Sequence, residues 1–103
     1  MADRIQQLQA LLQSEPDDPF CMYGLALEYA KLGQHEQAVA WFDQTLAANP
    51  NYCYAYFHKA KSQADSGEPA AAVETLRTGL TRAKAIGDGK AASEIASLLD
   101  ELT

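Results

Sequence analysis

The sequence has few of the residues on which catalysis, disulfide frameworks and metal sites depend, with two cysteines and two histidines among 103 residues. Two cysteines do not make a disulfide framework, so we expect Cys21 and Cys53 to be small apolar residues, buried or half-buried. His58 lies five positions after Cys53, which puts the side chains about 140° apart around a helix, too far for a nucleophile and its base. No Ser/His/Asp set, phosphate-binding glycine loop or metal-ligand spacing is visible. We therefore expect no catalysis, no cofactor and no metal.

The sequence also lacks long apolar runs and an excess of basic residues. No stretch approaches the roughly 18 apolar residues of a membrane-spanning helix, and the first residues show no basic region followed by an apolar run. Fourteen acidic residues against eight basic ones give a net charge of −6, which repels a phosphate backbone. We expect an acidic, cytoplasmic protein with no membrane insertion and no nucleic-acid partner.

Apolar residues recur at spacings of three and four, alanine is abundant and β-branched residues are few, a pattern that favours helices over strands. Five breaks divide the chain into six expected helices; they fall at residues 15–19, 32–35, 49–51, 65–69 and 87–89. Gly33 and Gly67 suit helix ends. Asp18, Asn51 and Asp88 are the expected N-caps. Because the loops are short, neighbouring helices should be antiparallel, and the predicted fold class is all-α.

The breaks and the apolar residues repeat with a period of 34 positions. Pro16 and Pro50 are 34 residues apart, and so are Gly33 and Gly67. Four apolar pairs share this spacing: Leu8 and Phe42, Phe42 and Leu76, Phe20 and Tyr54, and Tyr23 and Phe57. So many coincident spacings indicate an internal repeat of one helical hairpin.

A 34-residue helix-turn-helix unit of this kind resembles the tetratricopeptide repeat, whose pattern is Trp-x2-Leu-Gly-x2-Tyr, then Ala-x3-Phe, then Pro. Residues 19–52 resemble it closely, at Leu25, Tyr29, Gly33, Ala38, Phe42 and Pro50, and depart from it only by apolar exchanges, Met22 for Trp and Ala26 for Gly. Residues 53–86 resemble it less well, at Tyr56, Ala60, Gly67, Ala72 and Leu76. In this second unit Lys59, Gln63 and Lys84 replace the Leu, Tyr and Pro of the pattern, so we expect its first helix to pack less ideally.

The resemblance implies one domain over residues 1–103, a right-handed α-α superhelix of antiparallel helix hairpins. Residues 19–52 and 53–86 would be two full repeats, residues 2–15 an N-terminal half unit, and residues 88–102 a capping helix. In the capping helix we expect Ala92, Ile95, Leu99 and Leu102 to face inward, and Lys90, Glu94, Asp100 and Glu101 to face outward.

In the tetratricopeptide family the first helix of each unit lines a concave face that binds peptide segments of partners, so the resemblance implies such a groove. On each first helix one set of side chains falls within an arc of about 60°: Phe20, Tyr23 and Leu27 in one unit, and Tyr54, Phe57 and Lys61 in the next. Lys31 and His58 border these sets. The eight residues together are the predicted partner-binding groove. An alternative stays open, in which Phe20 and Tyr54 merely pack against a neighbouring or capping helix.

Some family members hold a C-terminal carboxylate with a clamp of lysine, asparagine and arginine. The corresponding positions here are occupied by Tyr23, Leu27, His58, Asp88 and Ala92. This departure from the family's clamp disfavours a co-chaperone role. We therefore expect an adaptor that binds a more apolar or aromatic peptide segment of a partner protein.

A second hypothesis is a structural unit that associates with copies of itself. Trp41 lies one residue before the core position Phe42, so its side chain either packs into a neighbouring hairpin or faces outward. An exposed Trp41 or an uncovered terminal helix would supply the contact between copies, and we expect a monomer or a weak homodimer.

Gly79, where the family prefers alanine, should permit a close helix crossing.

Overall fold

The computed structural model describes residues 2–103, with side chains from residue 4 onward, and this part of the chain forms six α-helices and no strand. The helices are α1 (Ala2–Ser14), α2 (Pro19–Lys31), α3 (His35–Ala48), α4 (Cys53–Asp65), α5 (Pro69–Ile86) and α6 (Gly89–Leu102). The predicted all-α class and the six helices are confirmed.

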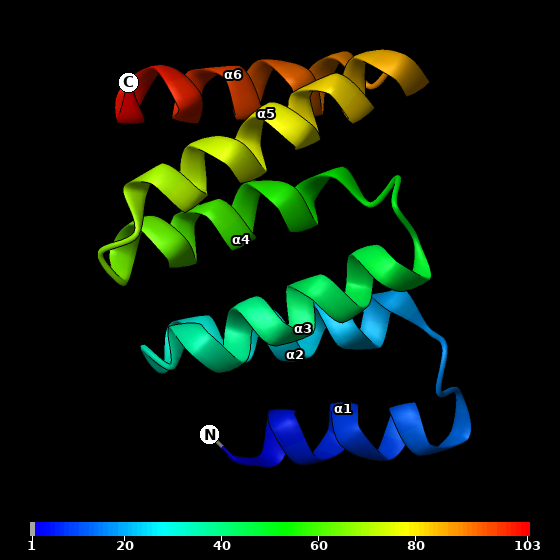
Figure 1. Cartoon of the computed structure of the whole chain (residues 1–103). Coiled ribbons are helices and arrows are strands. Elements are labelled where there is room, and N and C mark those ends of the chain that lie inside the picture. Colours follow the sequence, from blue (N-terminus) through cyan, green and yellow to red (C-terminus); the bar gives the residue numbers. More distant parts are fainter. Residues whose placement is uncertain (1) are drawn as a thin grey trace.

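Consecutive helices run antiparallel and form stacked layers, from α1 at the bottom of Figure 1 to α6 at the top. The tightest pairs are α2 with α3 and α4 with α5, which are the two hairpins, while α6 packs on both α5 and α4. The first helices of the two hairpins, α2 and α4, also meet directly, and α4 touches α6 as well. The fold is thus the predicted superhelix of hairpins, with α2, α4 and α6 in one row.

Local chemistry sets most of the helix ends. Pro19 and Pro69 open α2 and α5, where a missing backbone N–H costs nothing. Asp18 and Asp88 are confirmed as N-caps: their carboxylates accept hydrogen bonds from Phe20 N at 3.0 Å and Ala91 N at 3.1 Å. Gly33 and Gly67 follow α2 and α4 with φ values of 75° and 83°, the left-handed conformation expected at helix ends.

The prediction that Asn51 caps α4 is wrong. The side chain of Asn49 accepts a hydrogen bond from the Asn51 N–H at 3.0 Å, so the turn is stabilised by a side chain two residues before Asn51. The helix consequently starts at Cys53 with Tyr52 as the cap residue, and Tyr52 offers no side-chain hydrogen bond.

The core lies within and between the hairpins and depends on small residues. Ala26, Ala38, Ala60 and Ala72 are fully buried, which lets the helices cross closely. Two clusters form around them. One contains Ala26, Ala38, Phe42 and Ala55, and the other contains Cys53, Ala60, Ala72, Leu76, Ala83, Ala91 and Ile95. The second cluster joins α4, α5 and α6, so α6 belongs to the core.

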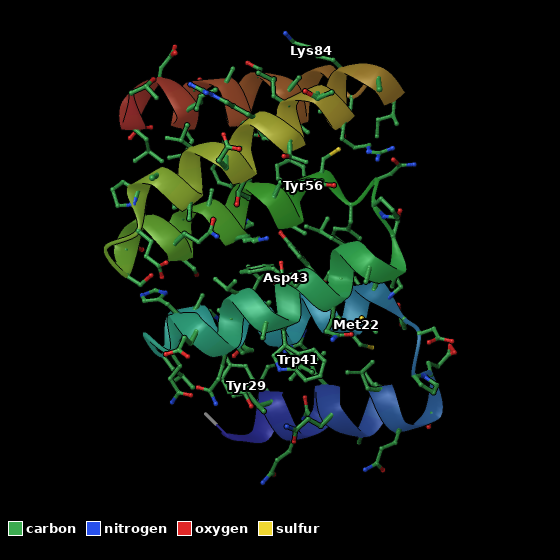
Figure 2. The ribbon with its side chains drawn as sticks, in the orientation of Figure 1. Met22, Tyr29, Trp41, Asp43, Tyr56 and Lys84 are labelled. Carbon is green, nitrogen blue, oxygen red and sulfur yellow. The ribbon has the colours of Figure 1, made fainter. Side chains whose placement is uncertain are left out.

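Two of the three departures in the second unit, at Lys59, Gln63 and Lys84, have polar partners. Lys59 Nζ lies 2.6 Å from an Asp43 carboxylate oxygen, an ion pair that links α4 to α3, and Figure 2 shows Asp43 between these helices. The Thr75 hydroxyl donates to Gln63 Oε1 at 2.7 Å, linking α5 to α4. Lys84 has an exposed side chain, and α5 runs through it to Ile86.

Gly79 and Trp41 both serve packing. A Cβ atom built on Gly79 would lie 2.6 Å from the Cβ of Tyr56, which confirms the predicted close crossing. Trp41 is half-buried against the cluster that contains Phe42, on the side of α3 that faces α1 in Figure 2. Both cysteines are buried and free.

Candidate functional site

A row of aromatic side chains crosses from α2 to α4 on the side where the first helices meet. The ring centroids of Tyr23 and His58 are 5.9 Å apart, those of His58 and Phe57 are 5.1 Å apart, and those of Phe57 and Tyr54 are 6.4 Å apart. We call these four residues the aromatic strip. The ring of His58 lies between the rings of the two units, so Tyr23 and Phe57 belong to one continuous row of neighbouring rings.

Two hollows lie beside the strip, one on each side of α4. The α2–α4 groove has a volume of about 370 Å³ and is lined by Leu27, Glu28, Ala30, Lys31, His35, His58, Lys61, Ser62 and Asp65. The α4–α6 groove has a volume of about 280 Å³ and is lined by Phe57, Lys61, Ser93, Glu94, Ser97, Leu98 and Glu101. Lys61 borders both, so the grooves are neighbours across a single ridge of α4.

Five of the eight predicted groove residues line these hollows, namely Leu27, Lys31, Phe57, His58 and Lys61. Tyr23 contacts them through His58 and packs its ring against Tyr52, with centroids 4.8 Å apart. Tyr54 is half-buried and its hydroxyl donates to Glu94 of α6, so it packs on α6. Phe20, at the start of α2, is 61% exposed and lines neither groove.

Burial and hydrogen bonding raise the pKa of the two phenols in the aromatic strip. Burial, with smaller effects of Tyr52 and Tyr54, raises the pKa of Tyr23 to about 12. The hydrogen bond to Glu94 and, to a smaller extent, burial raise the pKa of Tyr54 to about 12. Phenols are protonated at neutral pH in any case, and the raised pKa values keep Tyr23 and Tyr54 protonated to higher pH.

His58 is the titratable ring at the centre of the strip. Burial lowers its pKa, the Lys61 ammonium lowers it further, and Glu94 opposes them. The neutral imidazole is favoured, because a charged ring would lose its hydration among Tyr23, Phe42 and Phe57. His58 thus acts as one more aromatic ring of the surface at neutral pH.

Charged groups surround the apolar floors of both grooves. Lys31 Nζ lies 3.1 Å from a carboxylate oxygen of Glu28. Lys61 Nζ lies 5.6 Å from the centroid of the Phe57 ring, within range of a cation–π contact. Glu94 and Glu101 are exposed on α6 and face the α4–α6 groove. The sequence pattern put them on the outer side of α6 but did not associate them with the groove.

The two cysteine thiols are poorly suited to act as nucleophiles. Burial raises the pKa of the Cys21 and Cys53 thiols, aided by nearby acidic groups that include Asp18 and Asp88, so these thiols resist ionisation. Within residues 2–103 no three or more His, Cys, Asp or Glu side chains are gathered as a metal site. None of the helices described here combines the length and the apolar character that a bilayer crossing demands. What the site offers is an apolar, aromatic surface with charged edges.

Comparison with known proteins gives consistent matches. A family model described as tetratricopeptide repeat matches residues 5–64, and a second model with the same description matches residues 54–78. Superkiller protein 3 of Saccharomyces cerevisiae is 31% identical over 67 residues, which is 65% of this chain and 5% of that protein. The chain therefore spans about a twentieth of the length of this curated relative.

Three solved structures share the fold. The TPR2B domain of yeast Sti1, in a complex with pHsp70, has a TM-score of 0.89 and 28% identity, covering 95% of this chain and 78% of that one. Protein BPP2914 of Bordetella parapertussis has a TM-score of 0.83 and 26% identity, covering 95% and 85%. PcrH, solved with the chaperone-binding region of PopD, has a TM-score of 0.90 at 22% identity, covering 98% and 77%, a likeness of fold alone.

Proposed function

This chain belongs to the tetratricopeptide repeat family, and we propose that it is a protein-interaction adaptor whose α2, α4 and α6 face binds a peptide segment of a partner protein. The observation that carries the proposal is the unbroken series of ring contacts from Tyr23 through His58 to Phe57, with a groove on each side of α4. Rigid aromatic side chains supply large apolar contact area at a small entropy cost, which makes them effective binding anchors.

The relatives support a role in binding proteins. The similar domain of yeast Sti1 is described in a complex with pHsp70, and a longer piece of Sti1 with 28% identity is described in a complex with pHSP90. In our chain the positions that correspond to the family's carboxylate clamp include Tyr23, Leu27 and His58. We therefore propose an apolar or aromatic segment as the ligand rather than a chaperone tail.

The adaptor would act by holding its partner, with no catalytic step and no cofactor, as a monomer or a weak homodimer in the cytoplasm. The competing self-association through Trp41 has less support, because this side chain is half-buried against its own hairpins. Its remaining route is contact through a terminal helix. Sedimentation measurements over a range of concentrations distinguish the two arrangements.

The proposal is tested with a phage-displayed library of random peptides of about ten residues, which in extended form span about 33 Å, close to the 37 Å longest dimension of the fold. Selected peptides are titrated into the isotopically labelled chain. We expect amide chemical-shift changes to concentrate in α2, α4 and α6, because these helices line the grooves. Changes concentrated in α1, α3 and α5 would contradict the proposal.

Phe57→Ala is expected to weaken binding of the same peptides about tenfold or more, because it removes a central aromatic anchor. Ile86→Ala is the matched control, since Ile86 is a large exposed apolar residue at the end of α5, outside both grooves. Calorimetry gives both affinities, and circular dichroism checks that each variant is folded. Equal affinity of folded Phe57→Ala and Ile86→Ala would remove Phe57 from the site.

A further inference from the structure

We propose that the segment bound by this chain is cationic, with an arginine or lysine side chain seated in the α4–α6 groove. The inference rests on the proposed function and specifies its ligand. Phe57 of α4 and Leu98 of α6 form the apolar part of that groove, and Glu94 and Glu101 are its carboxylates. Such a site suits a long side chain with an apolar stem and a charged head.

The carboxylates occupy a regular position on α6. Glu94, Ser97, Leu98 and Glu101 follow one another at intervals of three, one and three residues, so they form one stripe along the helix. Glu94 and Glu101 are two turns apart, about 10 Å along the axis, with Leu98 between them. A guanidinium or ammonium group lying over Leu98 is therefore within reach of a carboxylate at either end.

Lys61 shows how a cation is accommodated at this place. Its ammonium lies 5.6 Å from the centroid of the Phe57 ring, and its side chain borders the same groove as Glu94 and Glu101. Lys61 is exposed, on a flexible stem. An incoming arginine or lysine of the partner would take over this ring face, while the ammonium of Lys61 moves out into solvent.

The charge around both grooves favours a cation over an anion. Four carboxylates line them, from Glu28, Asp65, Glu94 and Glu101, against the ammonium groups of Lys31 and Lys61. The nearest of these to a base is Glu28, which pairs with Lys31 at 3.1 Å. With His58 neutral and a net charge of −6 for the whole chain, an acidic peptide would meet repulsion and a basic one attraction.

The α2–α4 groove indicates which kind of residue lies next to the basic one in the ligand. Leu27 and Ala30 supply apolar surface on its α2 side, and His58 contributes the edge of the aromatic strip. An aliphatic or aromatic side chain of the peptide fits there. The partner segment thus carries a basic residue close to an apolar one.

The first test is the composition of the peptides selected from the random library. We expect arginine or lysine next to leucine, phenylalanine or a similar residue. Replacing that arginine with citrulline, which is neutral and nearly the same shape, should weaken binding about three- to tenfold. Selection of acidic peptides, or equal affinity of the citrulline form, would overturn this inference while leaving the groove in place.

The second test uses charge changes in the chain. Glu101→Gln should weaken a selected basic peptide about threefold or more, whereas Asp100→Asn, on the same helix but outside both grooves, should leave its affinity unchanged. Lys61→Met keeps an apolar stem and removes the competing ammonium, so it should tighten binding. Weaker binding by Lys61→Met would contradict a cationic ligand. Failure of any peptide to bind would overturn the proposed function and this inference together.

Discussion

Gly79 illustrates how a single residue sets the distance between two helices. It lies inside α5, where glycine is a poor helix former, yet its Cα faces the side chain of Tyr56 on α4. Tyr56 in turn donates its hydroxyl to the backbone oxygen of Pro50 at 3.0 Å. The large ring is therefore accommodated because its neighbour has no side chain, and the crossing of α4 and α5 depends on this pair.

The new methyl group of Gly79→Ala would lie 2.6 Å from Tyr56 Cβ, and this overpacking should cost about 1–3 kcal/mol. Alanine improves a helix by roughly 1 kcal/mol, so we expect the free energy of unfolding to fall by up to about 2 kcal/mol. Urea denaturation of both proteins gives the difference.

Gly89→Ala is the control for that experiment, since a Cβ atom at Gly89 would meet nothing within 4 Å. Its stability should be unchanged or slightly raised. Equal stabilities for Gly79→Ala and Gly89→Ala would show that the α4–α5 crossing adjusts without cost.

At the scale of helices, the second hairpin departs from the family pattern in the length of its second helix, α5. Lys84 stands where proline closes the first unit, and α5 has 18 residues where α3 has 14. The 34-residue period would start α6 at residue 87, whereas it starts at Gly89. Proline cannot continue a helix and lysine can. The replacement therefore lengthens α5 and moves the start of α6.

Lys59→Leu restores the residue type of the family pattern, and we expect it to raise the free energy of unfolding by up to about 1 kcal/mol. The Lys59 side chain is 21% exposed and that of Asp43 is 52% exposed, so their ion pair is screened by solvent and contributes little. Apolar packing of the leucine replaces it at no desolvation cost.

Asp43→Ala completes a double-mutant cycle for this pair. In the unmodified chain it should cost about 0.5 kcal/mol, and in the Lys59→Leu variant almost nothing. A large loss of stability in Lys59→Leu would mean that the ion pair holds α3 and α4 together.

At the scale of the whole molecule, each helix is stabilised by its immediate neighbours. The central helix α4 touches α2, α3, α5 and α6, whereas within the described part of the chain the backbone of α1 comes close to that of α2 alone. In such a stack stability is roughly a sum of units and interfaces between neighbours. The middle of the stack should therefore be its most stable part.

Hydrogen exchange should reveal this gradient. We expect backbone amides of α1 to exchange fastest among the six helices and those of α4 to exchange slowest, because local opening costs less where fewer interfaces are lost. Mass spectrometry of peptic fragments, or amide NMR spectra, measures the order. Uniform protection from α1 to α6 would indicate one cooperative unit instead of a graded stack.

Some residues of the site could be predicted from the sequence, and others depend on how the helices pack. The positions of Leu27, Phe57 and Lys61 follow from helical periodicity, since residues on one side of a helix stay together wherever that helix packs. Glu94 and Glu101 could be recognised as outward-facing, but their place beside Phe57 depends on where α6 rests against α4. Periodicity within one helix contains no information about its distance from another.

The amino-acid sequence by itself determined the six helices, most of their caps, the hairpin repeat and the small residues at the crossings, because each depends on near neighbours in the chain or on a fixed period. Only the tertiary structure decided that Tyr54 binds Glu94, that Phe20 lies outside the grooves, and that two hollows flank α4. The contact of Tyr54 with Glu94 and the α4–α6 groove arise from the position of α6, whereas the α2–α4 groove arises from the position of α2 against α4. Both positions result from packing between helices rather than from any local pattern.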